Sequence, residues 1–441
     1  MQGLIMAAQL IAGISILVIL HELGHFWAAR AFGIKVEKFY LFFDAWGVKL
    51  FSFKKGDTEY GIGWLPLGGY VKIAGMIDES MDTEQLAKPA EPWEFRSKPA
   101  WQRLIVMIGG VVMNIIAGVV IFAMITYTYG EKFTRNDSLK HGIVASELAQ
   151  EAGFKNGDKI ISVNSKPVVY FEDAFSSEEL LAEKTTYIVQ RNGADTAIIL
   201  PSDFTKKFTS SNKAEFISPR FEFVVDETIS GYPAEKGGVQ KGDLFIGIDS
   251  TPVPYFDVFQ QTLKTKAGKQ AAFSVLRAND TIQLNINVTS DGKIGIAPMP
   301  LGITYDSIQY GFFQSFPAGW NKAVETISVQ IKGWGKIFSG DIPANKAVQG
   351  PIGIAKFYGG EWIWSRFWLF TALISLGLAF MNILPIPALD GGHVVLLLIE
   401  MVTGKPISTK AMERIQTVGM VILLTLMVLI FGNDLIGLFN K

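Results

Sequence analysis

The chain has 441 residues, of which 49% are hydrophobic and 18% charged, and its formal net charge is −1. A soluble protein of this size carries about a quarter charged residues, so the shortfall indicates segments that lie in lipid. The near-neutral charge argues against a nucleic-acid-binding protein. The sequence contains no cysteine, which excludes disulfides and thiolate metal sites.

Four stretches are apolar over a length that can cross a bilayer, since about 20 helical residues span its hydrocarbon core. None of them contains a charged residue: Met1–Leu20, Leu104–Gly130, Phe367–Leu389 and Ile415–Asn433. We therefore predict a polytopic α-helical membrane protein with four transmembrane segments. Their predicted bounds are residues 1–33, 101–130, 367–403 and 415–437.

Lysine and arginine residues concentrate in two of the segments between these spans. Eleven of them lie between the first two charge-free stretches, from Arg30 to Arg103, and Lys405, Lys410 and Arg414 lie between the last two. The C-terminus has only Lys441. The positive-inside rule makes both segments cytoplasmic and places both termini and residues 131–366 outside. We expect a multi-pass protein of the bacterial inner membrane, with this long segment in the periplasm.

The cytoplasmic segment, residues 34–100, contains "EYGIGWLPLGGYVKIAG" from Glu59 to Gly75. Two short alternating runs joined by proline and glycine are typical of a β-hairpin. We predict a hairpin or small sheet that associates with the membrane beside the first span.

The outer segment contains an internal repeat. "AGFKNGDKIISVNSKPVVYF" (Ala152–Phe171) matches "GGVQKGDLFIGIDSTPVPYF" (Gly237–Phe256) at a constant offset of about 85 residues. In each copy a short helix is expected before a Gly-Asp turn, which a strand follows. We predict two small α/β domains, residues 131–219 and 220–304.

Residues 305–366 have apolar residues at helical spacing: Phe316, Trp320, Val324, Ile327, Ile331 and Trp334. Aromatic residues of this density favour an amphipathic helix at the outer membrane interface. A packed linker helix is the alternative.

The motif "HELGH" at the end of the first span has the pattern of a zinc site. His21 and His25 are four residues apart, so both lie on one face of a helix and can reach one ion. Glu22, one step around the helix, can act as general base. Catalytic zinc takes three protein ligands and keeps one open position.

The third ligand is expected in "NILPIPALDGGH", at the third span. Asp390 is the best candidate because an ionisable group at membrane depth usually marks function. His393 is the rival ligand. Pro385 and Pro387 are expected to break the helix and open space for water and substrate, and the glycines Gly391 and Gly392 permit a sharp turn.

These motifs, together with the tandem repeat and "GPIGIA", resemble in their order the site-2 protease family of intramembrane zinc metalloproteases. The resemblance implies that His21, His25 and Asp390 hold one Zn²⁺ and that Glu22 is the catalytic base. It implies a substrate-binding role for Asn382, which would contact the substrate backbone.

The same resemblance assigns substrate binding to the Gly61–Gly63 region, as an edge strand. Pro385, which opens space for the substrate, is also expected to bind it. The two repeated domains resemble PDZ domains, which bind peptides, often by their C-termini, as added strands. The implied substrates are pre-trimmed single-pass membrane proteins, such as an anti-sigma factor, and remnant signal peptides. The active site would face the cytoplasmic side.

Two other functions remain open at this stage. One is a non-enzymatic membrane scaffold that recruits peptides through its PDZ domains and holds a structural metal. The other is a metal or proton transporter, which is disfavoured because four helices with one closed ligand set offer no evident relay.

Overall fold

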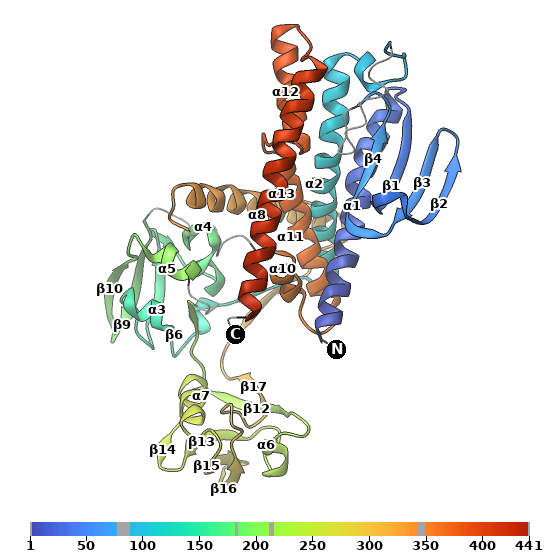
Figure 1. Ribbon diagram of the computed structural model, residues 1–441. Coiled ribbons are helices and arrows are strands. Elements are labelled where there is room, and N and C mark those ends of the chain that lie inside the picture. Colours follow the sequence, from blue (N-terminus) through green and yellow to red (C-terminus); the bar gives the residue numbers. More distant parts are fainter. Residues whose placement is uncertain (1, 77–88, 181–183, 211–215, 343–348, 440–441) are drawn as a thin grey trace. The chain divides into compact units, whose positions relative to one another are not determined.

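The computed structural model describes residues 2–76, 89–180, 184–210, 216–342 and 349–439. Lys88 and Lys441, two of the residues that bear on the predicted orientation, lie outside these ranges. The chain forms two compact units. Residues 1–130 and 309–441 form the first, and residues 131–308 form the second (Figure 1).

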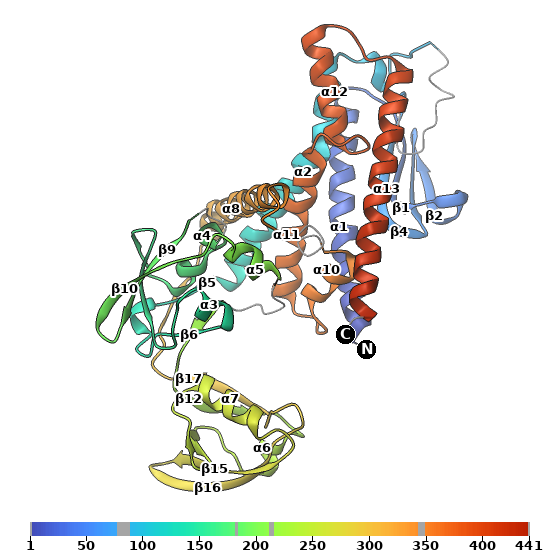
Figure 2. The same cartoon turned by 60° about the vertical axis from the view of Figure 1, so that its left-hand side comes forward.

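The first unit is a helical bundle with a sheet beside α1 (Figures 1 and 2). Four helices are long and apolar enough to cross a membrane, over Gln2–Ala31, Ala100–Tyr129, Trp364–Ile383 and Lys410–Gly432. These agree with the four predicted spans. The helices of this unit are α1 (Gln2–Ala31), α2 (Ala100–Tyr129), α8 (Phe312–Phe338), α10 (Pro351–Tyr358), α11 (Trp364–Ile383), α12 (Asp390–Thr403) and α13 (Thr409–Phe439).

The predicted third span, residues 367–403, is two helices separated by a break. α11 ends at Ile383 and α12 begins at Asp390, so the predicted break around the prolines is confirmed. The glycines act differently from the expectation, because both lie inside α12. A Cβ on Gly391 would lie 2.1 Å from the Leu384 carbonyl oxygen. The missing side chains let the connecting loop pack tightly against α12.

The insertion between the first two spans is a four-stranded sheet, and its order corrects the predicted hairpin. The strands are β1 (Val36–Phe43), β2 (Lys49–Lys55), β3 (Thr58–Gly63) and β4 (Leu65–Ile73), in the order β2-β3-β1-β4. β3 and β4 do not pair with each other, because β1 lies between them, parallel to β3 and antiparallel to β4. The tight hairpin is instead β2–β3.

This order also shows that the predicted role of Gly61 and Gly63 as an edge strand is wrong. Both residues lie on β3, which pairs with β2 on one side and β1 on the other. A Cβ on Gly61 would lie 2.4 Å from the ring of buried Tyr40, so this glycine makes room for packing inside the sheet. β4, which pairs with β1 alone among the described strands, has one of the two free edges of the sheet, and β2 has the other.

Helix α8 is amphipathic, as its spacing predicted. Gly319 packs against α2 so closely that a Cβ there would lie 2.6 Å from the backbone nitrogen of Ala123. A neighbouring face of the helix exposes large apolar side chains, among them Phe313, Trp320 and Ile331. One face therefore packs, as the linker alternative requires, and the other is apolar enough to face lipid.

The second unit contains two modules with separate hydrophobic cores, one from Leu139 to Ile217 and one from Phe223 to Ile294. Strands β5 (Glu131–Thr134) and β18 (Tyr305–Ile308) pair where the chain enters and leaves the unit. The first module contains β6 (Ile143–Ala145), α3 (Glu147–Glu151), β7 (Lys159–Val163), β8 (Lys166–Pro167), α4 (Ser177–Leu180), β9 (Thr186–Arg191), β10 (Ala194–Ile199), α5 (Phe204–Ser210) and β11 (Ile217–Pro219). The second contains β12 (Phe223–Thr228), α6 (Pro233–Lys236), β13 (Leu244–Ile248), β14 (Thr251–Pro252), α7 (Phe256–Thr265), β15 (Gln270–Arg277), β16 (Asp280–Asn287) and β17 (Ile296–Pro300).

An ion pair is repeated in the two modules. The aspartates of the Gly-Asp turns, Asp158 and Asp243, are buried, and each accepts two hydrogen bonds from an arginine at the end of a later strand. These arginines are Arg191 and Arg277. The sequence comparison found the turns and missed the arginines, because they lie outside the matched 20 residues.

We predict that Arg277→Met destabilises the second module by about 3 kcal/mol or more, because it leaves the buried Asp243 carboxylate without its partner. Hydrogen exchange of residues 223–300 in the full-length protein should accelerate by about a hundredfold. The matched control is Lys241→Met, which removes the exposed Lys241–Asp226 pair and should change exchange little. Equal protection in the two variants would contradict the prediction.

Candidate metal centre

A cavity of about 690 Å³ opens among α1, α11, α12, α13 and the sheet. His21, Glu22 and His25 line it from α1, Asn382 from α11, and Asp390 from the first turn of α12. The predicted catalytic and metal-binding side chains are therefore brought together, although about 365 residues separate the two motifs in the sequence.

Three ligand atoms converge in this cavity. Asp390 Oδ2 lies 3.3 Å from Nε2 of His21 and 3.3 Å from Nε2 of His25. The two Nε2 atoms are 3.2 Å apart. Among the described residues, His21, His25 and Asp390 form a group that could hold a metal ion, because their ligand atoms all lie within 4.8 Å of one another. Two imidazoles and a carboxylate form the ligand set of a catalytic zinc site.

The surroundings of these atoms fit a metal ion. Nδ1 of His25 lies 2.8 Å from the Val106 carbonyl oxygen, to which it can only donate. The proton is therefore on Nδ1, and Nε2 has a free lone pair for a metal. Asp390 Oδ2 is buried and makes no hydrogen bond of acceptable geometry with a described residue. A cation between the three atoms would satisfy it.

Helix α2 contributes no ligand but determines how closely the site can be packed. α1 and α2 cross at Gly24 and Gly109, where a Cβ on Gly24 would lie 2.1 Å from the Gly109 carbonyl oxygen. Small residues permit such close helix contacts in membranes. A Cβ on the next residue, Gly110, would lie 2.4 Å from Nε2 of His25. The Gly109-Gly110 pair was a sequence signal that went unused.

The other predicted residues divide into two groups. Asn382 is at the site, with Nδ2 3.4 Å from Nε2 of His21. His393 lines the same cavity, but its Nε2 faces Gln416 on α13, which favours Asp390 over this rival ligand. Pro385, Gly61 and Gly63 are absent from the described lining of the cavity.

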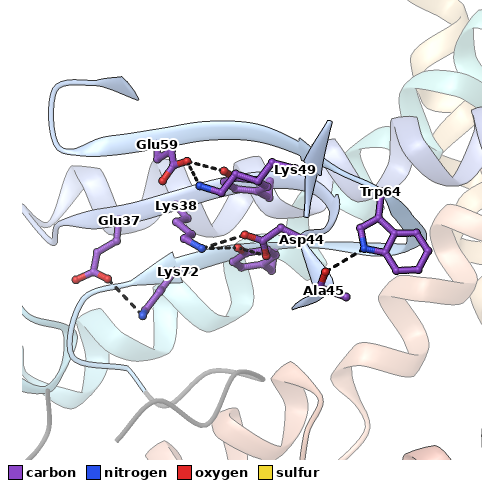
Figure 3. Close-up of polar contacts among 10 residues, drawn as sticks. Glu37, Lys38, Asp44, Ala45, Lys49, Glu59, Trp64 and Lys72 are labelled. Carbon is purple, nitrogen blue, oxygen red and sulfur yellow. Dashed lines mark hydrogen bonds and ion pairs between the residues drawn. The ribbon is translucent and has the colours of Figure 1, made fainter. Parts of the chain in front are cut away.

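β4, one of the two edge strands of the sheet, borders the cavity, since its residues Gly69, Tyr70 and Val71 line it. Polar contacts hold this strand in place (Figure 3). Lys38 on β1 donates hydrogen bonds to Asp44, at 3.1 Å, and to the Tyr70 hydroxyl, at 3.2 Å. The Tyr70 hydroxyl in turn donates to Asp44 at 2.8 Å. Burial raises the pKa of Asp44, but these two donors outweigh that effect and the pKa lies below its ordinary value.

We predict that Gly110→Ala weakens zinc binding by about tenfold or more, because the added methyl group would displace the His25 ring. Competition with a chelator of known affinity measures this. Gly118→Ala is the matched control, since its Cβ would meet the flexible Leu376 side chain away from the site. If both variants bind zinc like the wild type, Gly110 does not limit the geometry of the site.

Comparison with known proteins identifies the family. The sequence model of peptidase family M50 matches residues 9–426 of this chain. A putative zinc metalloprotease of Neisseria meningitidis is 30% identical, over 96% of this chain and 97% of the relative. A regulator of sigma E protease of Haemophilus influenzae is 30% identical, over 97% and 98%, and one of Escherichia coli is 29% identical, over 97% of each chain. This chain therefore belongs to peptidase family M50 and is a zinc metalloprotease of the site-2 type.

Proposed function

We propose that this protein cleaves transmembrane segments of other proteins within the bilayer, with His21, His25 and Asp390 as zinc ligands and Glu22 as general base. The main support for the proposal is that all three proposed ligands lie on, or directly after, helices that can span a membrane. Two come from α1, which is apolar enough to span a membrane, and the third comes from the helix that follows α11. In this proposal, the peptide bond that reaches them belongs to a segment in the lipid phase.

Each residue of the cavity has a chemical role in this proposal. When bound, the zinc ion supplies Lewis-acid polarisation of the scissile carbonyl and lowers the pKa of water. Glu22 takes the proton of the attacking water and delivers it to the leaving amide nitrogen. The Asn382 amide, beside His21, donates a hydrogen bond to the substrate backbone.

The free edge of β4 is the site proposed for substrate binding, in place of Gly61 and Gly63. A transmembrane helix must unwind before cleavage, and unpaired backbone groups are costly in lipid. An edge strand can accept those groups as an added strand. β4 has one unpaired edge among the described strands, and its residues line the cavity that contains Glu22.

The proposed substrates follow from the relatives named regulator of sigma E protease. We infer that the chain acts on an anti-sigma factor already trimmed by another protease, and also on remnant signal peptides. The membrane is the bacterial inner membrane, with both termini and the second unit in the periplasm. This orientation follows from the positive-inside rule, because lysine and arginine concentrate in segments 34–100 and 404–414.

We further infer that the two modules of the second unit are PDZ domains that exclude substrates with bulky outer domains and can bind peptide C-termini. The repeated order of short helix, Gly-Asp turn and strand supports this assignment. The alternative function is a PDZ scaffold with a structural metal. Glu22 favours the enzyme, because a structural site needs no additional carboxylate beside its ligands.

Glu22→Gln should retain zinc and lose cleavage of a transmembrane peptide by about 10²–10⁴-fold, because the general base is removed while the three ligands stay. Zinc content by atomic absorption and fragment yield in detergent provide the two readouts. Glu361→Gln, at an exposed position before α11, is the control and should cleave like the wild type. Undiminished cleavage by Glu22→Gln would exclude Glu22 as the base.

Replacing residues 139–303 with a short Gly-Ser linker should allow cleavage of substrates that keep their outer domain. The replacement is feasible because the ends are adjacent: the Thr304 backbone nitrogen lies 3.1 Å from Ser138 Oγ, and β5 pairs with β18. Trimmed substrate, cut by both proteins, controls for general activity. If the shortened protein still leaves untrimmed substrate uncut, the exclusion proposal is wrong.

A further inference from the structure

Asn114 on α2 is a buried polar residue that the mechanism above does not use. It is completely buried in a helix apolar enough to span a membrane. Its side-chain Nδ2 lies 3.2 Å from Nδ1 of His21. Its Oδ1 is buried and has no hydrogen-bond partner among the described residues. Placing an amide in such a helix is unfavourable, so its contact with His21 calls for a functional explanation.

The position of Asn114 along α2 supplies one. Val106, Gly110 and Asn114 follow one another at intervals of four residues, so they lie on one face of the helix. Val106 meets His25 through its carbonyl oxygen, and Gly110 leaves room for both imidazoles. This face of α2 therefore contacts the rear of the proposed ligand set along two helical turns.

The chemistry of the His21 ring determines what its Nδ1 atom needs. An imidazole that presents Nε2 to a metal carries its proton on Nδ1, and that proton requires an acceptor. For His25 the acceptor is the Val106 carbonyl oxygen. For His21 the group facing Nδ1 is the Asn114 amide. Rotating this amide by 180° exchanges its nearly isosteric nitrogen and oxygen, so that Oδ1 faces Nδ1.

We propose that Asn114 is a positioning residue of the metal centre. Its side-chain oxygen accepts a hydrogen bond from the Nδ1–H group of His21. The hydrogen bond holds His21 in the tautomer and ring orientation in which Nε2 faces Asp390 and His25. Helix α2 thereby positions both imidazoles, one through a main-chain carbonyl and the other through a side-chain amide. This inference rests on the proposed zinc site and adds to it a residue that is not a ligand.

Three substitutions separate an acceptor role from a donor role and from packing alone. Asn114→Asp keeps the acceptor and removes the donor, whereas Asn114→Leu keeps much of the volume and removes both. Asn114→Ala removes the side chain. Thr126→Val is the matched control, because Thr126 is also completely buried on α2, with an unpartnered Oγ1, and lies three turns away.

The experiment measures zinc affinity of the full-length protein in detergent by competition with a chelator. Asn114→Leu and Asn114→Ala should bind zinc about 10–100-fold more weakly than the wild type. Asn114→Asp should bind at least as tightly as the wild type, and Thr126→Val should be unchanged. If Asn114→Asp is as weak as Asn114→Leu, or if Asn114→Leu binds like the wild type, the acceptor role is refuted.

A second readout follows the tautomer itself. The chain has four histidines, so ¹⁵N-imidazole spectra of the zinc-loaded protein contain four rings. Asn114→Leu should disturb the Nδ1–H signal of His21 and leave that of His25 unchanged, because Val106 still holds the latter. Equal disturbance of both rings would indicate a packing defect and overturn the proposal. A wild-type protein that binds no zinc would instead refute the proposed zinc site.

Discussion

The structure depends on the convergence of three ionisable side chains at one point of an apolar helical bundle. Each of His21, His25 and Asp390 costs a few kcal/mol to place at membrane depth. Coordination of zinc is worth about 10 kcal/mol in small peptide sites and can offset that cost. The gain requires all three ligand atoms to be close to one another, and they lie within 4.8 Å. The neighbouring helices pack closely enough to permit this arrangement.

Glycine residues at the helix contacts allow the bundle to pack this closely. Gly24 and Gly109 let α1 and α2 touch along their backbones, and Gly110 leaves space for the imidazoles. Gly391 lets the loop after α11 fold onto the first turn of α12, where Asp390 begins the helix. In lipid, where hydrophobic burial does not drive helices together, such close packing is a principal source of association.

The sheet and the second unit give the metal centre its proposed selectivity. A free edge on β4 beside Glu22 suits a substrate that must be extended before it can be cut. The Lys38–Asp44–Tyr70 contacts keep that strand against β1. In the second unit, the paired arginine and aspartate of each module stabilise the turn that defines the repeat. Cleavage would then be limited both by the outer domains of a substrate and by its capacity to unwind.

The sequence by itself determined the features that local spacing encodes. The four-residue interval places His21 and His25 on one helical face, and charge-free stretches identify the four spans. Asp390, between prolines and glycines, is the first acidic residue of the predicted third span. The repeat also follows from sequence, because its two copies carry the same turn and strand pattern.

Only the tertiary structure decided which distant segments meet. β1 lies between β3 and β4, so the expected hairpin and the edge role of Gly61 and Gly63 were wrong. Arg191 and Arg277 find their aspartates from more than 30 residues away, and Val106, Gly110 and Asn114 contact the imidazoles from a helix with no ligand motif. The spacing of apolar residues along a segment indicates which of its faces is apolar. Strand pairing and helix contact depend on the combined packing of several segments, which no single stretch of sequence contains.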